Sequence, residues 1–313
     1  MQPDEDHGLR VLSCQSCRGL LNDLRSVLAE AGLDLEKQPL WHDLADLRWL
    51  ANLEGPVLAN DPDPVGQARR ERGFVDAVAL KRSVVALELT RKMEGWRTVV
   101  KKLRFWRLRG TPEHEITQRT EQSNDFLYEV EMACRLSKLP SSTVAFSEPD
   151  LLVHGSGIGT WTAACKRPQK IGSIVRAADV AGRQISKAGR PGVVLISLDN
   201  VIDPLVEDTS GKSLEPACHR RMGAIVNRQG PSIIAQLARY LPTAEQQRHG
   251  VVGVVTTAWF FLWGRDGVGG PEFMNTRLEP CGIQRAHPAW ANEFTRDLIR
   301  DLKRADEQVE SRY

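Results

Sequence analysis

The stretch "TWTAACKRP", residues 160–168, decides how this chain folds. Small and apolar residues lead into Lys166 and Arg167, just downstream of "SEPDLLVHG" at residues 147–155. An ammonium group at the end of an apolar strand loses hydration, so Lys166 needs a compensating carboxylate. The sequence therefore has to be searched for the acid that lies beside Lys166.

Strand periodicity indicates where that acid comes from. Side chains alternate between the faces of a strand, which gives two sets: Trp161, Ala163 and Cys165 on one face, and Thr162, Ala164 and Lys166 on the other. Asp150 begins the preceding strand, directly after Pro149, and Gly155 and Gly159 allow a tight return. An antiparallel hairpin would then bring Asp150 next to Lys166.

A helix predicted at residues 124–136 supplies further carboxylates, Glu129 and Glu131. An aspartate, a lysine and a helix glutamate gathered over a sheet are typical of sites that cleave phosphodiester bonds with a metal ion. Carboxylate oxygens are ligands that Mg²⁺ prefers, and the bound ion lowers the pKa of a water molecule. We therefore expect a metal-dependent site at the hairpin.

The surrounding pattern predicts an α/β fold with a mixed central sheet flanked by helices. The expected elements are helix 124–136, strands 150–154 and 160–166, helix 171–189, strand 192–200, helix 221–241 and strand 251–262. Residues 1–110 read instead as a helical N-terminal region, with leucines at helical spacing before Gly32. We place the domain boundary near residue 110, which leaves 111–313 as the α/β domain.

This series resembles the PD-(D/E)xK, or restriction-endonuclease-like, nuclease superfamily. The matching pieces are "YEVEMACRL" in the first helix, "PDLLV" in the first motif strand, "ACKRP" in the second, and the helix and apolar strand that follow. The resemblance covers residues 124–200 and leaves 1–110 uncovered. It implies the restriction-endonuclease-like core and the activity of a nuclease that acts on DNA with Mg²⁺ or Mn²⁺.

The resemblance also implies roles for individual residues. Asp150 and Glu129 would be metal ligands and catalytic carboxylates, Lys166 would be the catalytic lysine, and the main-chain carbonyl of Cys165 would be a further metal ligand. Glu131 is the second choice for the helix carboxylate. The nucleic-acid contacts that the resemblance suggests are Arg167 and Gln184.

One position departs from the family pattern, because Ala164 stands where the motif has its acid. The missing carboxylate would then come from Glu129, Glu131 or Glu148. Two other readings stay open: Ala164 is a substitution, or the domain is a catalytically inactive nuclease fold that binds nucleic acid or a protein partner. Loss of a metal carboxylate commonly lowers the rate by orders of magnitude. We favour a nuclease with a degenerate or relocated acid.

A basic segment precedes the α/β domain. From Lys81 to Arg109 there are ten Lys and Arg residues against two Glu. Three of them lie at helical spacing and form a basic stripe: Arg97, Lys101 and Arg104. An apolar stripe lies beside it and consists of Val99, Leu103 and Trp106. A solvated face is the simplest reading of such a charge run. A stripe that faces phosphates would instead give sequence-independent, salt-sensitive binding of nucleic acid, most of all DNA.

Composition gives weaker guidance. The net charge of +2 does not by itself indicate nucleic acid. The start of the chain has no signal-peptide pattern, and the apolar run 250–263 is better read as a buried strand than as a membrane span. Six scattered cysteines suit a reducing cytoplasm, and the lone Cys14–Cys17 pair lacks the partners of a zinc site. We expect a cytoplasmic protein without a membrane partner; a homodimer stays open.

Overall fold

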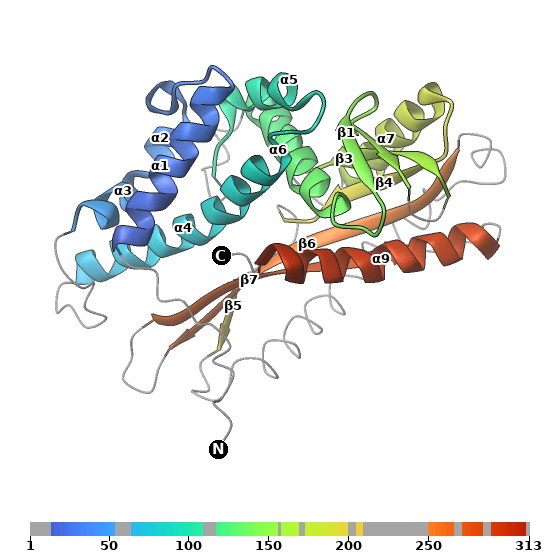
Figure 1. Cartoon of the computed structure of the whole chain (residues 1–313). Helices are drawn as coiled ribbons and strands as arrows, with labels where there is room; N and C mark the ends of the chain where they lie inside the picture. Colours follow the sequence, from blue (N-terminus) through green and yellow to red (C-terminus); the bar gives the residue numbers. More distant parts are fainter. Residues whose placement is uncertain are drawn as a thin grey trace.

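The N-terminal part of the chain is helical, as predicted. The computed structural model describes residues 14–53, 64–108, 117–155, 158–168, 173–199, 205–208, 250–265, 271–283 and 289–310. Its first elements are α1 (Cys14–Glu30), η1 (Leu35–Lys37), α2 (Leu40–Asp43), α3 (Ala45–Asn52), α4 (Pro64–Thr90), α5 (Trp96–Lys101) and η2 (Lys102–Phe105). These helices stand together at one end of the molecule, next to α6 (Figure 1).

Helix α1 shows why this region is helical. Its leucines recur every three or four residues, and Leu21, Leu24 and Leu28 are all buried. The chain leaves the helix at Gly32, whose φ of +79° lies in the left-handed region that glycine adopts at low cost. The stop predicted at Gly32 is therefore confirmed.

The rest of the described chain forms a mixed sheet packed with helices, as predicted. Its elements are α6 (Gln118–Leu136), β1 (Thr143–Phe146), β2 (Leu151–His154), β3 (Thr160–Lys166), α7 (Ile174–Ala188), β4 (Gly192–Ser197), β5 (Leu205–Asp208), β6 (Val251–Arg265), β7 (Pro271–Ile283) and α9 (Ala289–Glu310). The seven strands run in the order β1-β2-β3-β4-β6-β5, with β7 also on β6. The pairs β1–β2, β2–β3 and β6–β7 are antiparallel, whereas β3–β4, β4–β6 and β5–β6 are parallel.

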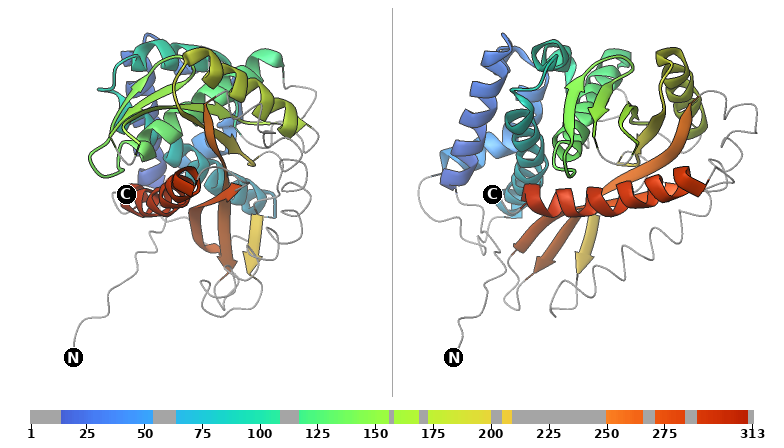
Figure 2. Two further views of the ribbon diagram at one scale, coloured as in Figure 1. Left: turned by 90° about the vertical axis from the view of Figure 1, so that its right-hand side faces the viewer. Right: turned by 45° about the vertical axis from the view of Figure 1, so that its right-hand side comes forward.

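The two faces of β3 pack against different helices. Trp161, Ala163 and Cys165 belong to the main hydrophobic core, which also contains residues of α6 and α9. Ala164 is equally buried but lies outside that core, and α7 packs on β3 and β4 with its own buried residues. The face assignment made from the alternation is therefore confirmed. Figure 2 shows α9 running along β6 and β7.

Most predicted elements of the α/β part are present, with shifted ends. Helix α6 begins at Gln118 rather than Asn124, because the Thr117 side chain caps it by accepting a hydrogen bond from the Thr120 N–H (3.2 Å). The apolar run 250–263 is confirmed as strand, in β6. Strands β1, β5 and β7 and helix α9 were not predicted. The helix expected at 221–241 and the boundary near residue 110 lie outside the described residues.

One hydrophobic core joins both halves of the described chain. It runs from Cys17 in α1, a buried free cysteine, to Val309 in α9. A buried ion pair between Arg135 of α6 and Asp306 of α9 (3.0 Å) links two of its helices. None of the helices in the described ranges is long and apolar enough to cross a membrane.

An acidic group among the N-terminal helices makes stability depend on pH. Burial raises the pKa of Asp76 to about 7, and the charges of Asp46 and Asp43 raise it further against the opposing effect of Arg72. An acid with a raised pKa holds its proton more tightly in the folded state than in the unfolded state. Its contribution to stability is therefore complete below its ordinary value of 3.8 and is lost as the pH rises through about 7.

We expect Asp76→Asn to reduce this pH dependence. The free energy of unfolding of the variant should exceed that of the wild type by on the order of 1 to 3 kcal/mol at pH 8 and should approach it at pH 4. Urea unfolding at both pH values measures the difference. Asp179→Asn, at an ion-paired surface position of α7, is the control and should leave the slope of the free energy of unfolding against pH unchanged. An unchanged slope in Asp76→Asn would contradict the expectation.

Candidate active site

The predicted hairpin places Asp150 directly beside Lys166. Leu151 of β2 pairs with Ala163 of β3, so the residue before β2 meets the end of β3. The Asp150 Oδ2 atom accepts a hydrogen bond from the Cys165 main-chain N–H (2.6 Å) and lies 3.3 Å from the Lys166 Nζ. The same Nζ donates to the Cys165 carbonyl (2.9 Å). The carboxylate that Lys166 requires is thus supplied by Asp150.

Both partners are largely removed from water. The side chains of Lys166 and Asp150 are 14% and 8% exposed. Burial raises the pKa of Asp150, while Lys166 and the Cys165 N–H act in the opposite direction. Burial would lower the pKa of Lys166, but the charges of Asp150 and Asp125 raise it above its ordinary value. Lys166 therefore stays an ammonium at neutral pH.

Glu129 contributes a second carboxylate from α6. The residue is only 4% exposed, and within the described part of the chain its side chain makes no hydrogen bond or ion pair. Burial raises the pKa of Glu129 well above its ordinary value, and the charge of Asp150 raises it further, against Lys166 and Lys102. A buried acid without a partner next to a second acid is an arrangement that a bound cation would stabilise.

Asp125 is a third carboxylate, which the sequence analysis did not single out. It precedes Glu129 by one helical turn, so both side chains lie on the same face of α6. Its Oδ1 atom accepts a hydrogen bond from the Arg167 main-chain N–H (3.0 Å). Burial raises the pKa of Asp125 to about 6, and Lys166 is the charge that opposes this rise most strongly. The i, i+4 spacing with Glu129 was the signal that could have identified it.

The other candidate acids lie elsewhere. Glu131 is buried on another side of α6, where its Oε1 atom accepts from Arg82 (2.9 Å) and Ser83 (3.1 Å). Glu148 is exposed to solvent. Ala164 is fully buried in β3, opposite Val194 of β4.

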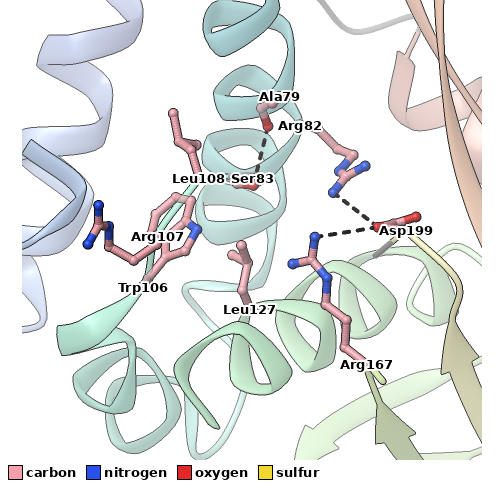
Figure 3. A pocket seen from close by; sticks show the side chains of 9 residues that line it. All are labelled: Ala79, Arg82, Ser83, Trp106, Arg107, Leu108, Leu127, Arg167 and Asp199. Carbon is pink, nitrogen blue, oxygen red and sulfur yellow. Dashed lines mark hydrogen bonds and ion pairs between the residues drawn. The ribbon is translucent and has the colours of Figure 1, made fainter. Parts of the chain in front are cut away.

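Arg167 turns its guanidinium away from the carboxylates. It lies 3.8 Å from Asp199, which follows β4, and Arg82 of α4 lies 3.7 Å from the same Asp199 oxygen. Figure 3 shows both guanidinium groups pointing toward Asp199 across a pocket lined by Trp106 and Leu127, among others. The Arg167 side chain is 7% exposed, so within the described structure it belongs to a buried charge network.

The remaining predicted contacts are in two places. Arg97, Lys101 and Arg104 are exposed on α5 and η2, and the apolar stripe beside them is buried: Val99, Leu103 and Trp106. Gln184 lies partly buried in α7, and its Oε1 atom has no hydrogen-bond partner among the described residues. None of the described contacts joins Gln184 to Asp150 or Lys166.

The donor set suits a hard cation with few protein ligands. Within the described residues, no three His, Cys, Asp or Glu side chains form a group that could hold a metal ion by themselves. Mg²⁺ commonly uses only one or two carboxylates and completes its shell with water and substrate phosphates. Asp150 and Glu129 are two such carboxylates, and a cation is favoured here because the buried Glu129 has no partner in the part of the chain that the structure describes.

Comparison of the chain with models of known protein families, with curated proteins and with solved structures gives no match. Any assignment of function therefore depends on the residues and the geometry of the site. The group formed by Asp125, Glu129, Asp150 and Lys166, which we call the acid–lysine cluster, is the part of the described chain with the most distinctive chemistry.

Proposed function

We propose that this chain hydrolyses phosphodiester bonds in nucleic acid, most readily in DNA, with Mg²⁺ or Mn²⁺ at the acid–lysine cluster. The observation that carries the proposal is the contact between Asp150 and Lys166 next to the buried Glu129, which has no partner among the described residues. Burial raises the pKa of all three acids of the cluster, and a divalent cation would offset the cost of ionising them beside one another.

The order of the elements supports a restriction-endonuclease-like domain. Helix α6, the antiparallel strands β1, β2 and β3, helix α7 and the parallel strand β4 follow one another along the chain. The "PD" pair directly precedes β2, and Lys166 is the last residue of β3. Ala164 leaves the position of the motif acid empty, and Asp125 and Glu129 of α6 are the carboxylates that act on Asp150 and Lys166 instead.

The residues of the chain would divide the chemistry among them. Asp150 and Glu129 would hold the cation, which when bound polarises the phosphate and lowers the pKa of a bound water. Lys166 would orient the attacking water and counter the charge that develops on the phosphate in the transition state. The Cys165 N–H keeps Asp150 in position through its 2.6 Å hydrogen bond. Asp125, with a pKa of about 6, could accept a proton near neutral pH.

A cleavage assay tests the proposal. Purified protein is incubated with single-stranded DNA, double-stranded DNA and RNA in Mg²⁺, Mn²⁺ or EDTA. We expect hydrolysis that requires the metal ion and that Asp150→Asn lowers on the order of 10²-fold or more, because the amide is a poor metal ligand. Asp179→Asn on the surface of α7 is the matched control and should retain activity.

Two outcomes would redirect the proposal. Full activity in Asp150→Asn would exclude the acid–lysine cluster as the active site. Binding of nucleic acid without hydrolysis in any metal would assign the chain to the inactive nuclease-fold module instead. Recovery of hydrolysis in Ala164→Glu alone would then identify the missing acid as the cause.

A further inference from the structure

A group of cations lies on two aromatic rings at the junction of η2 and α6. The Lys102 Nζ stands 4.3 Å from the centre of the Phe126 ring. The guanidinium groups of Arg104 and Arg119 lie 5.8 and 5.4 Å from the centre of the Phe105 ring. We call these five residues the η2 surface. Both rings are half-buried, and all three cations are exposed.

The three cations have no acidic partner among the described residues. Several other arginines in the N-terminal helices are paired with carboxylates, as Arg69 and Arg72 are with Asp46. A cation over an aromatic ring gains on the order of 0.5 to 1 kcal/mol at an exposed site, which is little enough to exchange for a phosphate. The η2 surface therefore offers positive charge to an anionic partner, and its rings become accessible when the cations move.

This surface is attached to the helix that carries the candidate site. The Ser123 hydroxyl donates to the Lys102 carbonyl (2.8 Å) and accepts from the Phe105 N–H (3.2 Å). Phe126 directly follows Asp125 and lies three residues before Glu129, so it is a neighbour of the acid–lysine cluster on α6. Lys102 also lowers the pKa of Glu129, which places its charge close to the same carboxylate.

We infer that the η2 surface binds an unpaired nucleic-acid strand, with bases stacked on Phe126 and Phe105 and phosphates held by Lys102, Arg104 and Arg119. Alternating aromatic and basic groups are the usual means of holding a single strand, because its bases expose their faces. The bases of a duplex are stacked on one another and cannot reach such rings. The inference rests on the proposed function in one respect: the bound nucleic-acid strand would lead to the acid–lysine cluster, where it would be cleaved. It names single-stranded nucleic acid as the preferred substrate.

Equilibrium binding in EDTA tests the inference without hydrolysis. Fluorescence anisotropy compares one labelled DNA oligonucleotide with the same oligonucleotide annealed to its complement. We expect the single strand to bind at least about tenfold more tightly, which is the effect of stacking roughly one base. Phe126→Leu should lose about tenfold in single-strand affinity, whereas Phe126→Tyr, which keeps the ring, should bind like the wild type.

Controls separate binding from folding. Thermal unfolding shows whether Phe126→Leu is folded, and Phe105→Leu repeats the test on the other ring. Lys102→Ala should reduce the slope of log affinity against log salt by about 0.7, the value for one single-strand phosphate contact. Lys187→Ala, an exposed cation on α7, should leave the slope unchanged.

The inference is overturned if duplex binds as tightly as single strand, if the two leucine variants bind like the wild type, or if neither nucleic acid binds. Its failure is distinguishable from failure of the proposed function. Single-strand binding without metal-dependent cleavage would support the η2 surface and remove the nuclease assignment. Metal-dependent cleavage of single-stranded DNA that does not change in the Phe105 and Phe126 variants would support the nuclease assignment and exclude the η2 surface as the binding site.

Discussion

Replacement of Lys166 by methionine should lower metal-dependent cleavage by on the order of 10²- to 10³-fold, the largest functional effect that the structure predicts. Methionine keeps much of the aliphatic stem but removes the ammonium that lies 3.3 Å from the Asp150 carboxylate. The positive charge that would stabilise the transition state is then absent. Steady-state rates on single-stranded DNA in Mg²⁺ measure the loss, and Lys187→Met on α7 is the matched control.

The same substitution should also change the pH dependence of any residual activity. Lys166 lowers the pKa of each carboxylate in the cluster, and it is the strongest opposing charge for Asp125. Without it, all three acids should hold their protons to higher pH, so the acidic limb of the pH–rate profile should move toward alkaline values. A profile that stays in place would contradict the effect of the Lys166 charge on these three acids. Wild-type activity in Lys166→Met would exclude Lys166 from the site.

The hairpin could be predicted because its signal is local. Alternation over the seven residues of β3, the "PD" start of β2 and the glycines between them specify the pairing without knowledge of the rest of the chain. Strand β1 escaped prediction because four residues, Thr143–Phe146, give too short a pattern. It is held by β2 on one side and by a hydrogen bond from the Phe146 N–H to the Glu94 carbonyl (3.0 Å), a contact distant in sequence.

The carboxylates of α6 show what helical periodicity can and cannot decide. Glu129 was predicted to lie near Asp150, and the two charges do act on each other. The same periodicity separates Glu131 from Glu129 by about 200° around the helix axis and aligns Asp125 with Glu129. The choice between these faces was therefore available from the sequence, because the helix predicted at residues 124–136 already contained Asp125.

The surroundings of Arg167 could not be read from the sequence. Its position after Lys166 suggested a contact with nucleic acid, but its guanidinium lies near Asp199, at the end of a parallel strand reached through α7. That proximity depends on how β4 aligns with β3. Contacts between side chains from separate strands depend on how the whole sheet assembles, whereas the pairing of a hairpin depends on one continuous segment of the sequence.

The buried pair between Arg82 and Glu131 should contribute the largest single effect on stability. Arg82 of α4 lies 2.9 Å from Glu131 of α6, and their side chains are 7% and 1% exposed. Arg82→Met would leave the Ser83 hydroxyl as the side chain that still donates to the Glu131 carboxylate among the described residues. A buried charge that loses its partner costs about 3–5 kcal/mol. Urea unfolding at pH 7 should therefore show a loss of this size.

A double variant and a control at an exposed ion pair show whether the loss of stability comes from the uncompensated Glu131 carboxylate. Arg82→Met combined with Glu131→Met removes both charges and should recover much of the lost stability, because no uncompensated carboxylate remains. Arg300→Met breaks the exposed pair with Asp297 and should change stability by less than about 1 kcal/mol. A loss in Arg82→Met no larger than in Arg300→Met would contradict the prediction. Because α6 carries Asp125 and Glu129 as well as Glu131, cleavage by the destabilised variant should fall with its folded fraction and return in the double variant.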